Sequence, residues 1–270
     1  MGLIRRALTP YVVARNTLDY PLRRLIRFER PVRGVRPAGL AAALEGLADR
    51  DAARAGQLIE RYGLARLVER GRRRDVLENL YYLELITSGL ERAGATLPGR
   101  LEAVDVGVSD WFYAPALVAA LRRWRAPGPR ELVVWGIETD PGQRYADGHT
   151  RQDWARWHTA GLAEATYLTS DARHWDRPVD MATMLFPFLF SRDSDDWGLP
   201  RRLFRPGELL GRIWSCLRPG GVLLVANQGE AERDEQRRLL ERAGIEAATE
   251  PFESAFWAYE LARYLHAARK

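Results

Sequence analysis

The first stretch of the chain has the hydrophobic spacing of an amphipathic helix. Within residues 3–28, apolar positions recur at three- and four-residue intervals on one helical face: Leu18, Leu22, Leu25 and Ile26. Arginines occupy the opposite face of the same helix. Pro31 and Pro37 interrupt the pattern, and the residues around them are predicted to form an extended linker.

Helical periodicity returns at Ala38. The sequence predicts helices over residues 38–48, 51–62 and 74–93. Gly63 closes the second, because glycine readily adopts the left-handed conformation that ends helices. The third carries an apolar stripe made of Val76, Leu80, Leu83 and Ile86. No strand-like run occurs in the first hundred residues, so residues 1–98 are predicted to form a helical N-terminal region. These helices are expected to cap the ligand edge and shape the acceptor pocket, or to build a dimer contact.

From Arg100 onwards, short apolar runs alternate with helical segments. The predicted strands cover residues 101–107, 131–137, 165–171, 179–186 and 220–227, with a last strand over residues 256–265. The predicted helices between them cover residues 115–124, 150–162 and 234–244. Buried β-branched runs separated by helices indicate a parallel sheet covered on both faces. Residues 99–270 are therefore predicted to form a doubly wound α/β domain.

Charge and cysteine content narrow the possible partners and the cellular compartment of the protein. The net charge is +5, but residues 1–36 alone contain nine arginines and two acidic residues. This asymmetry is compatible with contact to nucleic acid or to an anionic membrane, and equally with a solvated face. The single cysteine, Cys216, fits a reducing cytoplasm, and no apolar run is long enough to span a bilayer. The preference for arginine over lysine and the many alanines suggest a bacterial source.

The strand ends carry the candidate chemistry, because ligands of open parallel sheets bind beyond the carboxyl ends of the strands. The first strand ends in Asp105-Val106-Gly107, where a glycine allows a tight turn and close approach to a ligand. The second ends in Glu138, whose carboxylate can accept hydrogen bonds from a ribose diol. The third ends near Asp171, and a Pro-Gly-Gly turn at residues 219–221 precedes the fifth.

This ordered set resembles the class I S-adenosylmethionine-dependent methyltransferases, over about residues 100–270. The resemblance implies a doubly wound Rossmann-like methyltransferase sheet and S-adenosyl-L-methionine as cofactor. By the same resemblance Asp105 and Gly107 belong to the loop around the methionine part, Glu138 binds the ribose, and Asp171 with Ala172 binds the adenine. Leu217-Arg218-Pro219-Gly220-Gly221 matches another family motif.

The first loop departs from the family pattern. Ser109 and Trp111 occupy positions where the family usually has glycine, and both are counted among the cofactor-binding candidates. Ser109 is small enough to fit. For Trp111 three interpretations stay open. The loop takes another path, the indole lines the pocket and packs on a ligand, or cofactor binding is lost. A nicotinamide dinucleotide site fits poorly, because the third glycine that its motif needs is missing.

Substrate-side candidates come from the same sheet edge. Phe186 and Phe188 follow the fourth strand and Asn227 ends the fifth, so they are predicted to face the methyl acceptor, with core packing as the alternative. His149, in a long loop after the second strand, is the predicted catalytic base. No His, Cys and carboxylate group has metal-ligand spacing, so no metal is predicted.

The sequence therefore predicts an enzyme that methylates a small organic acceptor on oxygen or nitrogen, in bacterial secondary metabolism. Two alternatives remain open: an RNA-directed methyltransferase that uses the arginine-rich N-terminus, and a non-catalytic binding protein with a degenerate site. Other S-adenosylmethionine chemistry also fits the fold. The expected partners are a small-molecule substrate and a second copy in a homodimer, and the N-terminal arginines leave contact with nucleic acid or an anionic membrane open.

Overall fold

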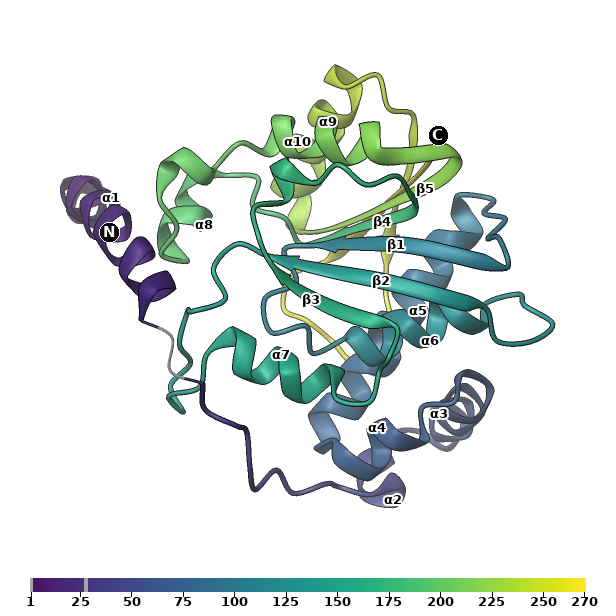
Figure 1. Ribbon diagram of the computed structural model, residues 1–270. Coiled ribbons are helices and arrows are strands. Elements are labelled where there is room, and N and C mark those ends of the chain that lie inside the picture. The colour runs from purple at the N-terminus through teal and green to yellow at the C-terminus, as the bar shows by residue number, and fades with distance from the viewer. Residues whose placement is uncertain (1, 27–28) are drawn as a thin grey trace.

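The computed structural model describes residues 2–26 and 29–270 and shows a central sheet with helices on both faces (Figure 1). The seven strands are β1 Arg100–Val106, β2 Glu131–Glu138, β3 Ala165–Thr169, β4 Val179–Leu185, β5 Leu217–Gln228, β6 Ala247–Phe252 and β7 Arg263–Arg269. Their order is β3-β2-β1-β4-β5-β7-β6. Strands β1 to β5 run parallel, and β7 is antiparallel to both β5 and β6. The predicted fold class, a doubly wound Rossmann-like methyltransferase sheet with an N-terminal helical region, is confirmed.

The helices begin and end close to the predicted boundaries in most of the chain. The longer ones are α1 Gly2–Leu25, α3 Asp49–Tyr62, α5 Arg73–Arg92, α6 Ala114–Arg123, α7 Arg151–Thr159, α9 Pro206–Cys216 and α10 Gly229–Arg242. The short ones are α2 Leu40–Leu44, α4 Ala65–Arg70, α8 Ser191–Asp196 and the 3-10 turns η1 Ala172–His174 and η2 Arg201–Leu203. Gly63 ends α3 with φ 70°, as predicted. No helix in the described part of the chain is long and apolar enough to cross a membrane.

Alternate residues of each strand point to opposite faces, and each face has its own core. One face buries Ala103, Val134 and Leu224 under α5 and α6, and the other buries Val104 and Val225 under α9 and α10. Helix α5 packs on α6 and also contacts β5 and β7, so it is one of the helices that cover the sheet. The division at residue 98/99 stays a prediction, because the core on this face combines residues from both sides of it.

Two parts of the predicted sheet need correction. The predicted last strand over residues 256–265 is instead a loop followed by β7, and β6 was not predicted because its exposed residues break the apolar run. The Pro-Gly-Gly turn lies inside β5 as an irregularity: Leu217 pairs with Val179, and the regular pairing resumes at Val222 with Met181. A Cβ on Gly221 would lie 2.8 Å from the Arg218 carbonyl oxygen, so glycine is required there.

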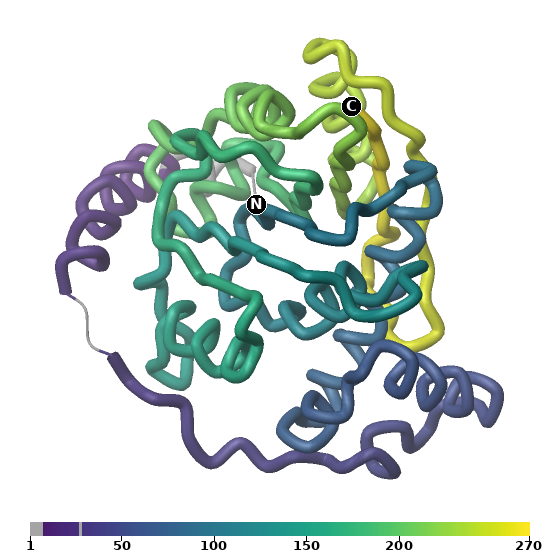
Figure 2. Tube along the Cα trace, turned by 45° about the vertical axis from the view of Figure 1, so that its right-hand side comes forward, coloured from purple at the N-terminus to yellow at the C-terminus, as the bar shows by residue number. Residues whose placement is uncertain are grey.

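The N-terminal helix lies apart from the helices that cover the sheet. Figures 1 and 2 show α1 at the side of the molecule, next to α8. Residues 29–39 then run without regular structure along the edge of the molecule to α2. Two contacts to α7 hold this linker, the Arg30 N–H to Asp153 (3.0 Å) and Glu29 to Arg156 (2.7 Å). The predicted extended linker is therefore present and attached.

Candidate functional site

A large cavity lies at the carboxyl ends of the parallel strands, with a volume of about 1020 Å³. This is the edge where a doubly wound sheet binds its ligand. Part of its wall comes from the strand tips, and we call this the strand-tip half: Gly107, Ser109, Glu138, Asp171 and Ala172. The other part comes from aromatic residues and their neighbours on α5, in the loop after β1, just after β4 and around the start of β7. We call this the aromatic half: Glu78, Tyr82, Phe112, Phe186, Tyr259 and Arg263.

The loop after β1 takes a path that removes Trp111 from the cavity. Gly107, Ser109 and Trp111 all have left-handed backbone angles, with φ of 75°, 54° and 50°. This winding turns the indole into the core, where it is fully buried and lies against Gly136 of β2. A Cβ on Gly136 would meet the indole ring at 2.8 Å. The loop therefore takes another path, and the indole does not pack on a ligand in the cavity. Loss of cofactor binding, the third interpretation of Trp111, stays open.

Asp105 holds the Trp111 side chain in this buried position. Its carboxylate accepts hydrogen bonds from the Trp111 indole N–H (2.8 Å) and from the Thr183 hydroxyl (2.7 Å), and it is fully buried. Burial raises the pKa of Asp105 to about 6, although the hydrogen bonds oppose this rise. Asp105 and Trp111 do not line the cavity. The structure gives them the role of supporting the loop that carries Gly107 and Ser109.

Glu138 is the central acid of the strand-tip half. One carboxylate oxygen accepts the Ser109 backbone N–H (2.8 Å), so Glu138 ties the tip of β2 to the loop after β1. The other oxygen accepts the Asp140 N–H (2.7 Å) and pairs with Arg151 at 3.1 Å. Arg151 is itself buried, with its guanidinium over the ring of Trp197 at 4.9 Å. The Glu138 carboxylate is thus held in one place at the cavity wall.

Asp171 lines the cavity beyond the end of β3, followed by Ala172. Its carboxylate accepts the Arg173 backbone N–H (3.0 Å) and pairs with the Arg173 guanidinium at 2.6 Å. Burial alone would raise the pKa of Asp171, but the hydrogen bonds from Arg173 outweigh it and leave the pKa below the usual value. Asp171 is therefore ionised at neutral pH and oriented by its neighbour.

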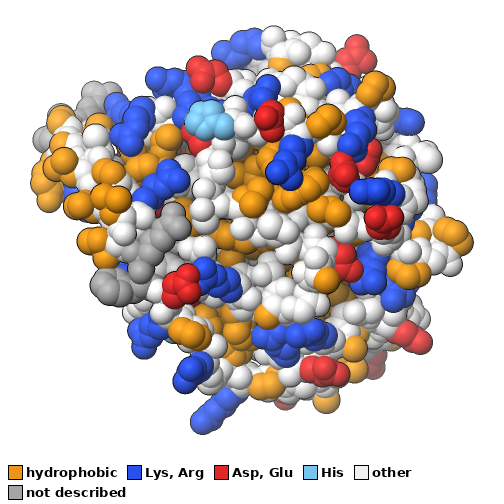
Figure 3. Space-filling view, viewed as in Figure 1, with side chains coloured by type: hydrophobic (Ala, Val, Ile, Leu, Met, Phe, Trp, Pro, Cys, Tyr) orange, Lys and Arg blue, Asp and Glu red, His pale blue; other side chains and the backbone are white. Residues whose placement is uncertain are grey.

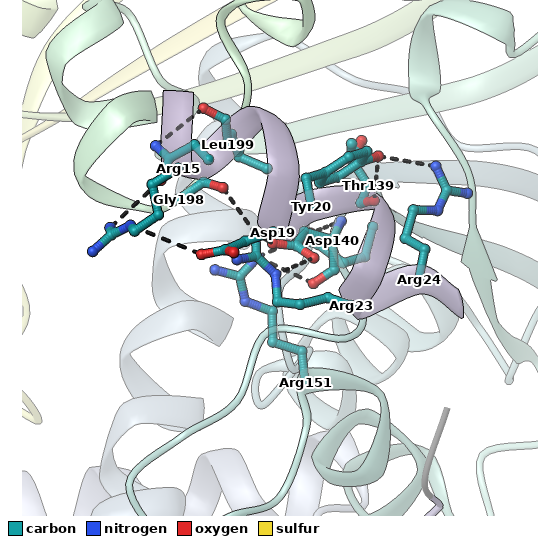
Figure 4. Close-up of polar contacts among 12 residues, drawn as sticks. Arg15, Asp19, Tyr20, Arg23, Arg24, Thr139, Asp140, Arg151, Gly198 and Leu199 are labelled. Atoms are coloured by element: carbon teal, nitrogen blue, oxygen red, sulfur yellow. Dashed lines mark hydrogen bonds and ion pairs between the residues drawn. The ribbon is translucent and has the colours of Figure 1, made fainter. Parts of the chain in front are cut away.

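Helix α1 contacts the chain segment beside the strand-tip half, although none of its described residues lines the cavity. Figure 4 shows Tyr20 and Arg23 reaching from α1 to the residues just after Glu138. The Tyr20 hydroxyl donates to the Thr139 carbonyl oxygen (3.1 Å), and Arg23 pairs with Asp140 at 2.7 Å. Asp140 has no exposed surface, so Arg23 neutralises a fully buried carboxylate. The N-terminal helix thus fastens the chain segment that carries Glu138.

The aromatic half is organised around Arg263, at the start of β7. Its guanidinium carbon lies 4.7 Å from the ring centre of Phe186 and 4.2 Å from that of Tyr259. Its Nη1 donates to the Gln228 side chain (2.7 Å), whereas its buried Nε–H has no hydrogen-bond partner. A buried donor without a partner is costly, so this nitrogen is suited to a ligand that accepts a hydrogen bond.

Phe186 has an unusual backbone for a phenylalanine. Its φ is 60°, a conformation that costs a non-glycine residue roughly 1–3 kcal/mol and that clusters at functional sites. The Phe186 N–H donates to the Ala226 carbonyl oxygen (2.8 Å), which holds the residue at the end of β4. Its ring contacts that of Tyr82 edge-on at 6.2 Å. Phe186 thus lines the aromatic half, on the side where the sequence placed the methyl acceptor.

The other predicted substrate and catalytic residues are distributed differently. Phe188 lines the cavity against Trp197. Asn227 is fully buried outside the cavity lining, and its amide O and N have no hydrogen-bond partner. His149 also lies outside the lining, with Nδ1 3.3 Å from an Asp147 carboxylate oxygen. Asn227 and His149 therefore do not reach the cavity. The alternation of side chains along β5 turns Asn227 away from it, and the hairpin closed by Arg144 and Thr150 turns His149 away.

Another carboxyl group lines the cavity and was not predicted. Asp110 follows Ser109, and burial raises its pKa to about 6, opposed by a hydrogen bond from Tyr145. The Tyr145 hydroxyl also lies 3.3 Å from the Ser109 hydroxyl. The signal in the sequence was the acid at the end of the DVGVSD run, which the prediction treated only as part of the loop. In the described residues no group of three or more His, Cys, Asp or Glu is placed to hold a metal ion.

The strand order, the antiparallel β7 and the cavity at the strand tips define the fold as the Rossmann-like type of class I methyltransferases. No family model and no curated protein matches the chain. Among solved structures, the chain is similar to a SAM-dependent methyltransferase from Aquifex aeolicus, with 19% identity over 72% of this chain and 96% of that one (TM-score 0.47).

Two further solved structures are similar at the same level. TrmN from Thermus thermophilus matches with 19% identity over 70% of this chain and 48% of that one, with a TM-score of 0.47. Magnesium protoporphyrin IX methyltransferase (ChlM) from Synechocystis PCC 6803, with bound SAH, matches with 14% identity over 82% of this chain and all of that one, again with a TM-score of 0.47.

Proposed function

We propose that this protein is an S-adenosyl-L-methionine-dependent methyltransferase that acts on a small organic acceptor. The observation that carries the proposal is the strand-tip half of the cavity, where Gly107, Glu138 and Asp171 follow three adjacent strands and line one space. These are the positions that the family resemblance assigns to the methionine part, the ribose and the adenine. The volume of about 1020 Å³ leaves room for a cofactor together with an acceptor.

The residues at the strand tips fit such a cofactor. A Cβ built on Gly107 would find no atom within 4 Å, so the backbone there borders open space that a ligand can approach. Glu138 and Asp171 are both held by arginines. The Glu138 oxygen that accepts the Ser109 N–H has one acceptor position left for a ligand, whereas Arg173 engages both Asp171 oxygens and must shift to admit a ligand donor. When bound, S-adenosylmethionine supplies an electrophilic methyl group on a sulfonium.

The aromatic half supplies the acceptor site. Tyr82, Phe186 and Tyr259 bring three aromatic rings to its wall, which favours a flat or unsaturated acceptor and excludes water. The unpartnered Nε–H of Arg263 favours an acceptor that carries a negatively charged oxygen. Positioning the acceptor is the main task of these residues, since orientation alone contributes much of the rate of a displacement reaction.

An acceptor that loses a proton during methylation needs a base, and Asp110 is the best-placed group. It lines the cavity between Ser109 and Phe112, and its pKa of about 6 lies close to neutral pH. Above pH 6 its carboxylate can take the proton of a hydroxyl or amine. Methylation on oxygen or nitrogen by a bacterial enzyme of secondary metabolism, working in the cytoplasm, remains our proposal from the sequence.

The test is calorimetric titration with S-adenosylmethionine and with S-adenosylhomocysteine. We expect Glu138→Gln and Asp171→Asn to weaken binding roughly 10- to 100-fold, the range for losing hydrogen bonds to a charged group. Glu131→Gln is the matched control, because Glu131 lies at the opposite end of β2, exposed and away from the cavity. It should bind both ligands as the unchanged protein does.

Two results would overturn the proposal. One is a folded protein that binds neither ligand, which would favour the non-catalytic binding protein. The other is binding that neither variant at the strand tips weakens, which would place the ligand elsewhere. Thermal unfolding of each variant distinguishes loss of binding from loss of fold, which matters for Glu138 because it also accepts the Ser109 N–H.

A further inference from the structure

Helix α1 exposes its apolar face. Among the described residues, six of the ten large hydrophobic side chains with high exposure belong to α1 or follow it directly: Leu8, Tyr11, Leu18, Leu22, Leu25 and Ile26. We call these six residues the α1 stripe. Their spacing of three, four and seven residues places them along one side of the helix. A row of large apolar side chains in water is typical of a surface that another body covers.

The inward face of α1 is polar, which is the reverse of an ordinary surface helix. The buried Asn16 donates to the Asp195 carbonyl oxygen (2.7 Å), Tyr20 to that of Thr139, and Arg23 pairs with Asp140. These contacts point away from the α1 stripe by about half a helical turn. The helix is therefore attached to the protein by polar bonds, and its apolar side is directed outward.

Positive charge surrounds the α1 stripe. Arg15 lies on the stripe itself, half exposed, with Asp19 as its ion-pair partner at 3.9 Å. The linker adds exposed Arg33 and Arg36. Figure 3 shows hydrophobic side chains gathered at the side of the molecule where α1 lies, with Lys or Arg side chains beside them.

We propose that the α1 stripe binds the surface of a bilayer that contains anionic lipids. A helix with an apolar face and flanking arginines lies in the plane of the interface, with its apolar side chains among the acyl chains and its cations among the phosphates. A second copy is a poorer partner, because a two-fold contact through the stripe would bring like-charged arginine borders together.

The experiment is co-flotation of the full chain with vesicles, either of phosphatidylcholine alone or of phosphatidylcholine mixed with phosphatidylglycerol. We expect binding to the mixed vesicles to be roughly tenfold stronger or more, since arginines near the stripe are attracted to an anionic surface. Higher salt should weaken it. The triple variant Leu18→Ser/Leu22→Ser/Leu25→Ser should lower vesicle binding roughly tenfold or more, because it removes apolar surface from the contact.

The matched control is the double variant Leu40→Ser/Leu261→Ser, which removes exposed leucines away from α1 and should bind vesicles as the unchanged protein does. Circular dichroism confirms that each variant is folded. Three results would overturn the proposal: no flotation with either vesicle, a dimer that the triple variant dissociates, or salt-sensitive RNA binding without vesicle binding. None of these measurements depends on methyl transfer, so the proposal stands or falls independently of the proposed function.

Discussion

Helices α1 and α5 have similar apolar stripes in the sequence but opposite surroundings in the structure. Helix α5 buries its stripe, and Val76, Leu80 and Leu83 have no exposed surface. Helix α1 leaves its stripe in solvent, where Leu18 is 67% exposed. The difference lies in what each helix faces: α5 packs on α6 and the sheet, whereas α1 contacts α8 and the polar turn after β2. Periodicity thus predicts that a helix has an apolar face, but not what covers that face.

The largest contrast is expected from removing a leucine side chain from each helix. Leu83→Ala should lower the free energy of unfolding by about 2–5 kcal/mol, because it leaves a cavity in a fully buried site. Leu18→Ala should change it by less than about 0.5 kcal/mol. Urea unfolding of both variants measures the difference. Equal losses would mean that the α1 stripe is buried in solution, for example by a second copy.

The pH dependence of the free energy of unfolding tests whether the side chain packed beside α5 is buried. His158 of α7 is largely buried near Asp75 and Arg72, and burial lowers its pKa to about 4. The folded protein then binds fewer protons than the unfolded chain between pH 6.5 and pH 4, so His158 costs stability as the pH falls through this window. Relative to the unchanged protein, the His158→Gln variant should gain about 3 kcal/mol of stability by pH 4, since a shift of one pKa unit corresponds to about 1.4 kcal/mol.

That relative gain is the quantity to measure, by urea unfolding of both proteins across the pH range. Absolute curves combine opposite trends, because burial raises the pKa of Asp105 and Asp110 to about 6, and their contribution to stability falls as the pH rises through the same window. A stability difference between the two proteins that does not change with pH would show that His158 is solvated. Helix α1 contains no histidine and should add nothing to this difference.

Replacing a glycine by alanine is expected to change the free energy of unfolding by a smaller amount, with opposite signs at Gly89 and Gly56. A Cβ on Gly89 of α5 would lie 2.8 Å from the side chain of Leu224, which is fully buried and cannot move aside. Gly89→Ala should therefore destabilise the protein by roughly 1–2 kcal/mol. Gly56→Ala on α3 meets nothing within 4 Å and should stabilise it by about 0.5–1 kcal/mol. Thermal unfolding of both variants decides the signs, and a stabilising Gly89→Ala would contradict the tight packing of α5.

The smallest effect on global stability is expected at the attachment of α1. Arg23→Gln removes the ion pair with Asp140, but α1 can loosen and let water reach the carboxylate. The free energy of unfolding should therefore fall by no more than about 1 kcal/mol, while amide exchange in α1 accelerates. Arg15→Gln is the control, because its pair with Asp19 is exposed and long. Unchanged exchange in α1 after Arg23→Gln would show that other contacts hold the helix.

The sequence was most informative where local pattern and burial agree. Strands β1, β2, β4 and β5 were predicted because both faces of each are covered, so their apolar runs are nearly continuous. Strand β3, at the edge of the sheet, is only partly buried and was predicted from its β-branched and aromatic residues. Strand β6 was missed because it alternates exposed and half-buried residues. Helix α8 was missed because its sequence SRDSDD contains no apolar stripe.

The same limit applies to the candidate site. Glu138 and Asp171 were predicted because a strand end fixes the position of the residue there. Arg151 and Arg263 were not, because their places at the cavity depend on how a loop folds back, which no short-range pattern encodes. Trp111 was counted among the cofactor-binding candidates with an altered loop path as one alternative, because a motif with a single glycine does not determine whether a loop contains three left-handed residues.

The contact between Trp111 and Gly136 has an evolutionary consequence. The indole fills the space that a side chain on Gly136 would need, and its N–H satisfies the buried Asp105. A larger residue at position 136 would expel the ring, and a smaller one at position 111 would leave both a void and an unsatisfied acid. Descendants of this chain should therefore change these two positions together or not at all, and the pair should mark the lineage that inherited this version of the loop.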